Sequence, residues 1–159
     1  MPAADTSKVD RAALIAEAYE AAKAAHAPYS RFAVGAAVLL SDGRVVRGAN
    51  FENASYGLSL CAETVALAEV NMAGALGDVV AVGVVGGVMG ADGIEGATPV
   101  RPCGRCRQIL NEAAQLGGRD LEIFCASADG LVVERHMLSD LLPHAFGPSD
   151  LGITPTRSG

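Results

Sequence analysis

The spacing of apolar positions predicts an amphipathic helix near the start of the chain. Ser7 and Asp10 form a Ser-x-x-Asp start signal, and Pro28 is expected to end the helix. The residues expected to share its buried face are Leu14, Ala18, Ala21 and Ala25.

Two later stretches have the pattern of β-hairpins. Residues 32–40 and 45–50 are rich in Val and flank an Asp-Gly pair, and residues 121–126 and 131–135 flank a second one. Asp-Gly favours the tight turns that join antiparallel strands. A short helix over residues 137–142 is expected after the second hairpin.

Helical spacing also begins at Cys61 and recurs over residues 104–116. Residues 79–88 between these helices read as a buried strand, and the glycine-rich segment 90–102 reads as an irregular loop. The resulting order is α-β-β-α-β-α-β-β-α. This order predicts the α/β class: a three-layer α/β/α sandwich around a five-stranded mixed sheet.

Composition limits the size and the partners of the molecule. The 159 residues fit one domain, 1–159, with a core of about 8–151 and a frayed tail after Ser149. Half of the residues are hydrophobic, 19% are charged and the mean hydropathy is +0.30, which makes buried subunit contacts plausible. The formal net charge of -6 favours a small-molecule substrate over a nucleic acid.

The sequence predicts a cytoplasmic protein without a membrane span. Its N-terminus is polar, without the apolar run of a signal peptide, and its longest apolar stretch, 79–89, is interrupted by glycines. Cysteines in a reducing compartment are more often metal ligands or core residues than disulfides. The spacing of the four cysteines therefore decides their role.

Three cysteines stand at the starts of two predicted helices. Cys61 begins one helix, and Cys103 and Cys106 lie on the first turn of another. Two thiolates three residues apart can reach one ion, and a third from a neighbouring helix completes a three-sulfur site with an open fourth position. Helix N-termini favour the thiolate form. The pattern predicts one catalytic Zn²⁺.

Glu63 follows Cys61 by two residues and is the candidate proton-transfer group beside the metal. Without a metal it would be an ordinary first-turn glutamate. Cys125 is interpreted as a buried strand residue. The three histidines lie outside any ligand-spaced pair and are interpreted as structural: His26, His136 and His144.

Several segments resemble a known family. Cys-Ala-Glu at 61–63 followed by Pro-Cys-Gly-Arg-Cys-Arg-Gln at 102–108 matches the zinc deaminase signature. The Pro-Tyr-Ser-Arg-Phe segment from residue 28, the Asn-Phe-Glu-Asn segment from residue 50, and Leu-Leu-Pro-His-Ala-Phe-Gly-Pro at 141–148 are similar to the small homotetrameric cytidine deaminases. The resemblance runs from about residue 28 to residue 151.

This resemblance implies zinc held by the three cysteines, and Glu63 as the catalytic residue that moves protons between water, the ring N3 and the departing amine. It also implies a homotetramer with shared active sites. The implied substrate contacts are Asn50 and Glu52 on the ribose, Phe32 against the base, Tyr56 near the sugar, Ala62, and Phe146 in a neighbouring subunit's site.

Two residues depart from the family pattern. Thr64 stands where an arginine is usual, and Arg101 stands where a small residue is usual. The leading hypothesis is hydrolysis of cytidine and deoxycytidine to uridine and deoxyuridine in pyrimidine salvage. The alternatives are deamination of another aminated heterocycle or a blasticidin-type nucleoside antibiotic, and a purely structural zinc protein.

Overall fold

The sheet is mixed, and its centre is a long strand that pairs with neighbours of both directions. The computed structural model describes residues 9–155. Within that range the strand order is β2-β1-β3-β5-β6, with β4 paired to β3. Only β3 and β5 run parallel; the other pairs are antiparallel. The strands are β1 (Phe32–Leu40), β2 (Val45–Ala49), β3 (Val79–Gly90), β4 (Gly93–Glu95), β5 (Glu122–Ser127) and β6 (Val133–Met137).

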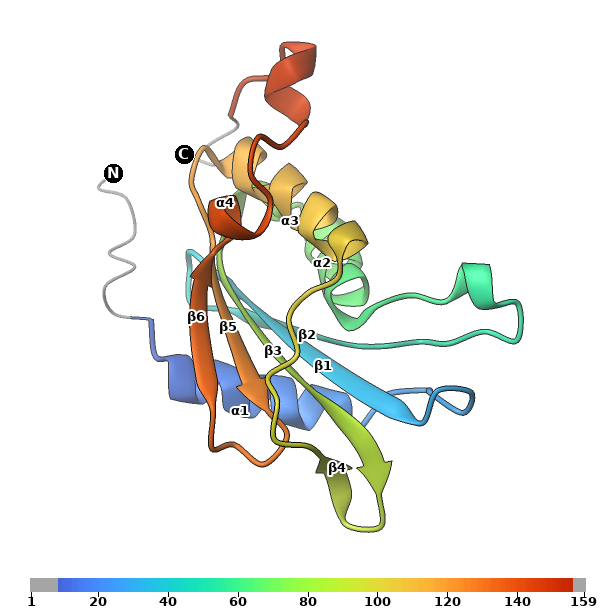
Figure 1. Ribbon diagram of the computed structural model, residues 1–159. Coiled ribbons are helices and arrows are strands. Elements are labelled where there is room, and N and C mark those ends of the chain that lie inside the picture. The colour runs from blue at the N-terminus through green and yellow to red at the C-terminus, as the bar shows by residue number, and fades with distance from the viewer. Residues whose placement is uncertain (1–8, 156–159) are drawn as a thin grey trace.

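Helices cover both faces of this sheet, which confirms the three-layer α/β fold (Figure 1). α1 (Arg11–Ala22) lies on one face, and α2 (Ala62–Met72), α3 (Gly104–Gly117) and the short α4 (Leu138–Leu141) lie on the other. The larger core cluster lies beneath α2 and α3, where Val, Leu and Ala side chains of the sheet are fully buried. Burial of such side chains contributes most of the folding free energy.

The first helix begins at its predicted start signal but ends earlier than predicted. Asp10 is the N-cap, because its carboxylate accepts a hydrogen bond from Ala13 N at 3.0 Å, and Ser7 lies outside the described residues. The helix ends at Ala22, well before Pro28. The chain then leaves the helix because His26 N donates to the carbonyl of Asn50 at 3.0 Å, which ties the connection to the end of β2.

β4 was not predicted, because its segment is short and rich in glycine. It forms a hairpin with the end of β3, in which Gly90 faces Gly93. Strand β6 also begins two residues later than predicted. Ser127 N donates to Val132 O, and Leu131 N donates to the Asp129 carboxylate, so the turn between β5 and β6 is longer than an Asp-Gly pair alone.

The C-terminal segment after α4 is tied to α3 at Ser149. A 3₁₀ helix spans Pro148–Leu151, and both the amide and the hydroxyl of Ser149 donate to Gln115 Oε1. Among residues 9–155 the structure contains no helix long and apolar enough to cross a membrane.

Candidate active site

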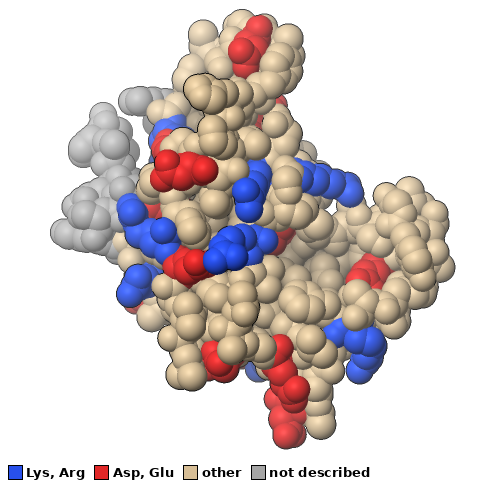
Figure 2. Space-filling view, in the orientation of Figure 1, with Lys and Arg blue, Asp and Glu red and all other residues tan. Residues whose placement is uncertain are grey.

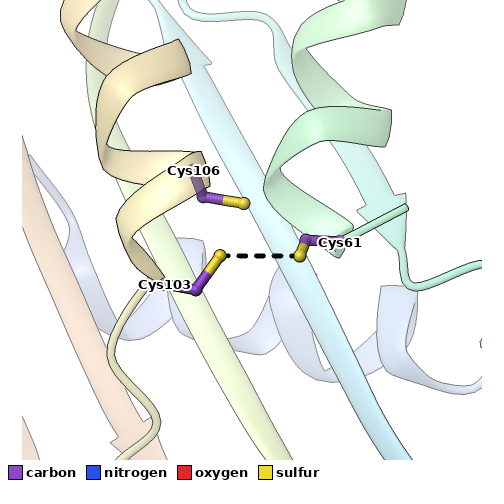
Figure 3. A group of neighbouring side chains, drawn as sticks. All are labelled: Cys61, Cys103 and Cys106. Atoms are coloured by element: carbon purple, nitrogen blue, oxygen red, sulfur yellow. Dashed lines mark hydrogen bonds between the residues drawn. The ribbon is translucent and has the colours of Figure 1, made fainter. Parts of the chain in front are cut away.

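The three cysteines of the sequence pattern meet between the starts of α2 and α3. Cys61 is the N-cap of α2, Cys103 is the N-cap of α3, and Cys106 lies one turn further on. All three sulfur atoms lie within 4.8 Å of one another, and their side chains point toward a common space (Figure 3). Two helix starts from distant parts of the sequence thus build one cluster.

The sulfur cluster fits a zinc ion. The Sγ atoms of Cys61 and Cys103 are 3.6 Å apart, and tetrahedral zinc with bonds of about 2.3 Å needs sulfurs roughly 3.8 Å apart. Burial raises the pKa of the thiols of Cys61 and Cys106 above their ordinary value. A bound cation is therefore what would hold these sulfurs as thiolates.

Glu63 lies on the first turn of α2, beside this cluster. Its side chain is only 3% exposed, and burial raises the pKa of its carboxyl above the ordinary value. A buried carboxyl whose pKa is raised by desolvation beside a metal cluster is a candidate for general acid–base catalysis. The position and the environment of Glu63 therefore fit the predicted role in proton transfer.

A cavity of about 220 Å³ opens beside the cluster. Three of the six predicted substrate residues line it: Asn50, Glu52 and Ala62. The whole lining is Val34, Asn50, Glu52, Ser59, Leu60, Cys61, Ala62, Glu63, Val100, Arg101 and Cys103. The structure therefore brings a metal cluster, an acid–base group and polar side chains to one small cavity.

Asn50 follows β2 and joins it to the first residues of β1. Its amide oxygen accepts from Val34 N at 2.9 Å, and its amide nitrogen donates to Phe32 O at 2.9 Å. The amide nitrogen retains one further N–H that can donate to a ligand. Glu52 is held by a neighbouring turn: Oε1 accepts from the amides of Tyr29 and Ser30, and Oε2 accepts from the Ser30 hydroxyl.

Three predicted contacts lie outside the lining of this cavity. Phe32 is half-buried at the start of β1. Tyr56 is 73% exposed and contacts the ring of Tyr29, with ring centroids 5.5 Å apart. Phe146 is 62% exposed, and its carbonyl accepts from Gln108 Nε2 at 2.8 Å. A single chain therefore presents these last two aromatic side chains to solvent.

Three further residues lie at the site without being among the predicted ligands or substrate contacts. Val100 and Arg101 line the cavity from the glycine-rich segment, and the Arg101 guanidinium donates to Glu134 on β6 at 2.8 Å. The hydroxyl of Thr64 lies 3.6 Å from Cys106 Sγ. Arg101 and Thr64 stand out in the sequence as departures from the family pattern, and Val100 lies in the glycine-rich segment 90–102 but was not named by itself.

The remaining candidate ligands lie elsewhere. Cys125 is buried in β5, where burial raises the pKa of its thiol to about 12, as expected for a core residue. A larger open groove of about 510 Å³ runs between α3 and the C-terminal segment. It includes His144 but none of the three clustered cysteines, so it is not the site of the metal chemistry.

The comparisons with known proteins agree with this geometry. Residues 8–116 match the family model of the cytidine and deoxycytidylate deaminase zinc-binding region. The chain belongs to this deaminase family. It is therefore a zinc-dependent hydrolase of the cytidine deaminase type, and the resemblance noted in the sequence is confirmed.

Relatives of this deaminase cover nearly its whole length. It is 45% identical over 143 residues to a cytidine deaminase of Halalkalibacterium halodurans, covering 90% of this chain and 98% of the relative. It is 46% identical over 143 residues to that of Mycobacterium tuberculosis, covering 90% and 94%. A crystal structure of cytidine deaminase from Burkholderia pseudomallei has a TM-score of 0.72 and 43% identity, covering 85% and 98%.

Proposed function

We propose that this deaminase hydrolyses cytidine and deoxycytidine to uridine and deoxyuridine, with release of ammonia, in pyrimidine salvage. The observation that carries the proposal is the single cavity shared by Cys61, Cys103 and Glu63 with the polar side chains of Asn50 and Glu52. Relatives with 45% and 46% identity are named cytidine deaminases, which supports the same substrate.

Cys61, Cys103 and Cys106 would hold the zinc. When bound, zinc with an open coordination position lowers the pKa of water to about 7 and supplies a nucleophile at neutral pH. Glu63 takes a proton from the attacking water and gives it to the ring N3. It then transfers the second proton to the exocyclic amine, which leaves from C4 as ammonia while the water oxygen remains on C4. Burial of Glu63 keeps bulk water from competing for these protons.

Asn50 and Glu52 would bind the sugar, since an amide N–H and a carboxylate complement hydroxyl groups. Ala62, fully buried in the lining, would contact the base through its backbone and methyl group. Phe32 would stack near the base and Tyr56 would approach the sugar. The largely exposed Phe146 would complete the site of a neighbouring subunit.

A homotetramer is part of this proposal. Two segments project from the body of the molecule, residues 51–58 and the C-terminal turn around Pro148–Leu151 (Figure 1). Large apolar side chains are exposed on or beside them: Phe51, Tyr56, Leu58, Phe146 and Leu151. Figure 2 shows that the tip of the projection formed by residues 51–58 carries no charged side chains. Exposed apolar projections of this kind are typical of subunit contacts.

The cytoplasmic location of the protein stays a prediction.

The test is turnover of cytidine, deoxycytidine and free cytosine by the zinc-loaded protein, followed by ultraviolet absorbance and ammonia release. We expect both nucleosides to react and cytosine to remain. Glu63→Gln should retain zinc and lose activity by about 10²- to 10⁴-fold, the usual contribution of a positioned acid–base group. Glu69→Gln, an exposed change on the same helix α2, is the matched control and should retain full activity.

The other outcomes separate the alternatives. Turnover of free cytosine, or of another aminated heterocycle that carries no sugar, would contradict the proposal that the substrate is a nucleoside. A zinc-loaded protein that is inert toward all such compounds, and whose metal site is unchanged in Glu63→Gln, would support a structural zinc role instead.

A further inference from the structure

The carboxylate of Glu52, which lines the cavity, already accepts hydrogen bonds from three donors. All three belong to the turn formed by residues 28–30. The amides of Tyr29 and Ser30 each donate to Oε1 at 3.1 Å, and the Ser30 hydroxyl donates to Oε2 at 2.5 Å. All three donors lie more than 20 residues earlier in the chain than Glu52. The direction of this carboxylate is therefore set by the turn.

The turn itself is held at both ends. Arg31 adopts a left-handed conformation with φ of 57° and donates its amide to Ala27 O at 3.0 Å. The Ser30 oxygen also accepts from the amide of Phe32 at 3.1 Å. Because Phe32 N–H occupies one side of that oxygen, the hydroxyl proton of Ser30 is directed to Glu52. The start of β1, the turn and Glu52 thus form one hydrogen-bonded unit.

The number of donors limits what Glu52 can still bind. A carboxylate offers about four lone-pair sites, and three are taken here, so about one remains for a ligand. A lone pair fixed in this way accepts a hydroxyl from one direction only. Such preorganisation reduces the entropy lost when the ligand binds.

We propose that Ser30 is a positioning residue: its hydroxyl orients the Glu52 carboxylate so that the remaining acceptor site faces the sugar of the nucleoside. The proposal rests on the proposed function, because it assumes that the sugar binds at Glu52. Ser30 itself lies outside the cavity lining and acts through Glu52.

The hydrogen bond from Ser30, followed by the two turn amides, lowers the pKa of Glu52 below its ordinary value, while burial acts against them. Loss of the hydroxyl should therefore raise the pKa of this carboxyl. Carbon-detected NMR titration of the protein labelled at glutamate carboxyls measures this shift without any substrate, and Glu52→Gln identifies the resonance by its absence.

The kinetic experiment compares two substrates that differ only at the sugar. Ser30→Ala should lower kcat/KM for cytidine about tenfold, mainly through KM, as expected for a hydrogen bond to a charged group. Ser30→Ala should change kcat/KM by less than about twofold for 2′,3′-dideoxycytidine, which lacks the 2′ and 3′ hydroxyls of the sugar. Ser30→Thr keeps the hydroxyl and should restore most of the loss with cytidine.

Ser139→Ala is the matched control. The Ser139 hydroxyl donates to Asp120 Oδ2 at 2.5 Å and its amide donates to Oδ1 at 3.2 Å, the same arrangement outside the lining of the active-site cavity. This variant should leave KM for both substrates unchanged.

Equal losses on both substrates, or a Glu52 pKa that does not move in Ser30→Ala, would overturn the positioning role. A wild-type protein inactive toward cytidine would instead contradict the proposed function. In that case the NMR titration still decides whether Ser30 controls Glu52, so the two failures are distinguishable.

Discussion

Thr64 is the side chain whose hydroxyl approaches the sulfur cluster from outside the ligand set, 3.6 Å from Cys106 Sγ. Two nearby arginines bond elsewhere: Arg105 donates to Ser59 O at 3.3 Å and Arg107 donates to Pro102 O at 2.7 Å. Three thiolates on a divalent ion carry a net charge of about -1, which outer hydrogen bonds help to stabilise. Here a neutral hydroxyl supplies that contact.

Removal of this hydroxyl should weaken metal binding. We expect Thr64→Val to lower zinc affinity by about tenfold, at the lower end of the range for partners that contact metal ligands. Competition with a chromophoric chelator measures the affinity directly. Thr98→Val, at an exposed loop position, is the control, and Thr64→Ser should retain normal affinity. Unchanged affinity in Thr64→Val would assign the hydroxyl to packing alone.

At the scale of elements, two glycines set how closely the helices approach the first hairpin. Gly35 on β1 lies against α1, where an added Cβ would lie 2.5 Å from Ala22 N and in hard contact with Ala18 O. Gly48 on β2 lies against the start of α2, where an added Cβ would lie 2.5 Å from Ala66 N. Each helix therefore packs backbone to backbone on a strand, which no other residue permits.

These two glycines give a paired prediction. Gly35→Ala and Gly48→Ala should each destabilise the fold by about 1–3 kcal/mol or more, because overpacking displaces a helix. Only Gly48→Ala moves α2, the helix that carries Cys61 and Glu63, so it alone should also reduce zinc content and turnover. Thermal unfolding and metal analysis of both variants test this. Equal zinc content in the Gly35→Ala and Gly48→Ala proteins would show that the metal cluster, and not the contact with β2, fixes the position of the start of α2.

The elements that sequence predicted best are those with a strong local signal. β1 has the expected bounds, and α3 begins at the expected Gly104, because apolar spacing and glycine stops mark them clearly. β4 was missed because Gly93–Glu95 becomes a strand only by pairing with β3. The cysteine cluster was predicted from the spacing of Cys103 and Cys106, from the helix start at Cys61 and from the resemblance to the zinc deaminase signature. Val100 was not identified by itself, because the path of the irregular loop 90–102 decides which of its side chains face the cavity.

At the scale of the whole molecule, Phe146 lies outside the lining of the active-site cavity of its own chain. Its side chain is 62% exposed, while its backbone is fixed by bonds from Gln108 and Asn111 on α3. An apolar side chain held rigidly in solvent is suited to insertion into a second subunit. The proposed tetramer would use it in that way.

Mixing of two defective proteins tests this arrangement. Phe146→Ala lacks the donated ring and Glu63→Gln lacks the proton-transfer group, so each homotetramer should be poorly active. If they are denatured together and refolded with zinc, roughly a quarter of the sites should pair an intact Glu63 with an intact Phe146 under random association. Activity should then rise above that of either variant refolded alone. No gain in mixed tetramers would place Phe146 outside the neighbouring site.

The metal cluster also imposes an order on biosynthesis. Cys61 precedes Cys103 by 42 residues. At about 5–20 residues per second, the ribosome therefore adds Cys61 to the chain roughly 2–8 seconds before Cys103 and Cys106. During that interval the nascent chain has one thiol and no partner for it. Zinc capture is thus a late event, and the supply of metal matters most when α3 emerges from the exit tunnel.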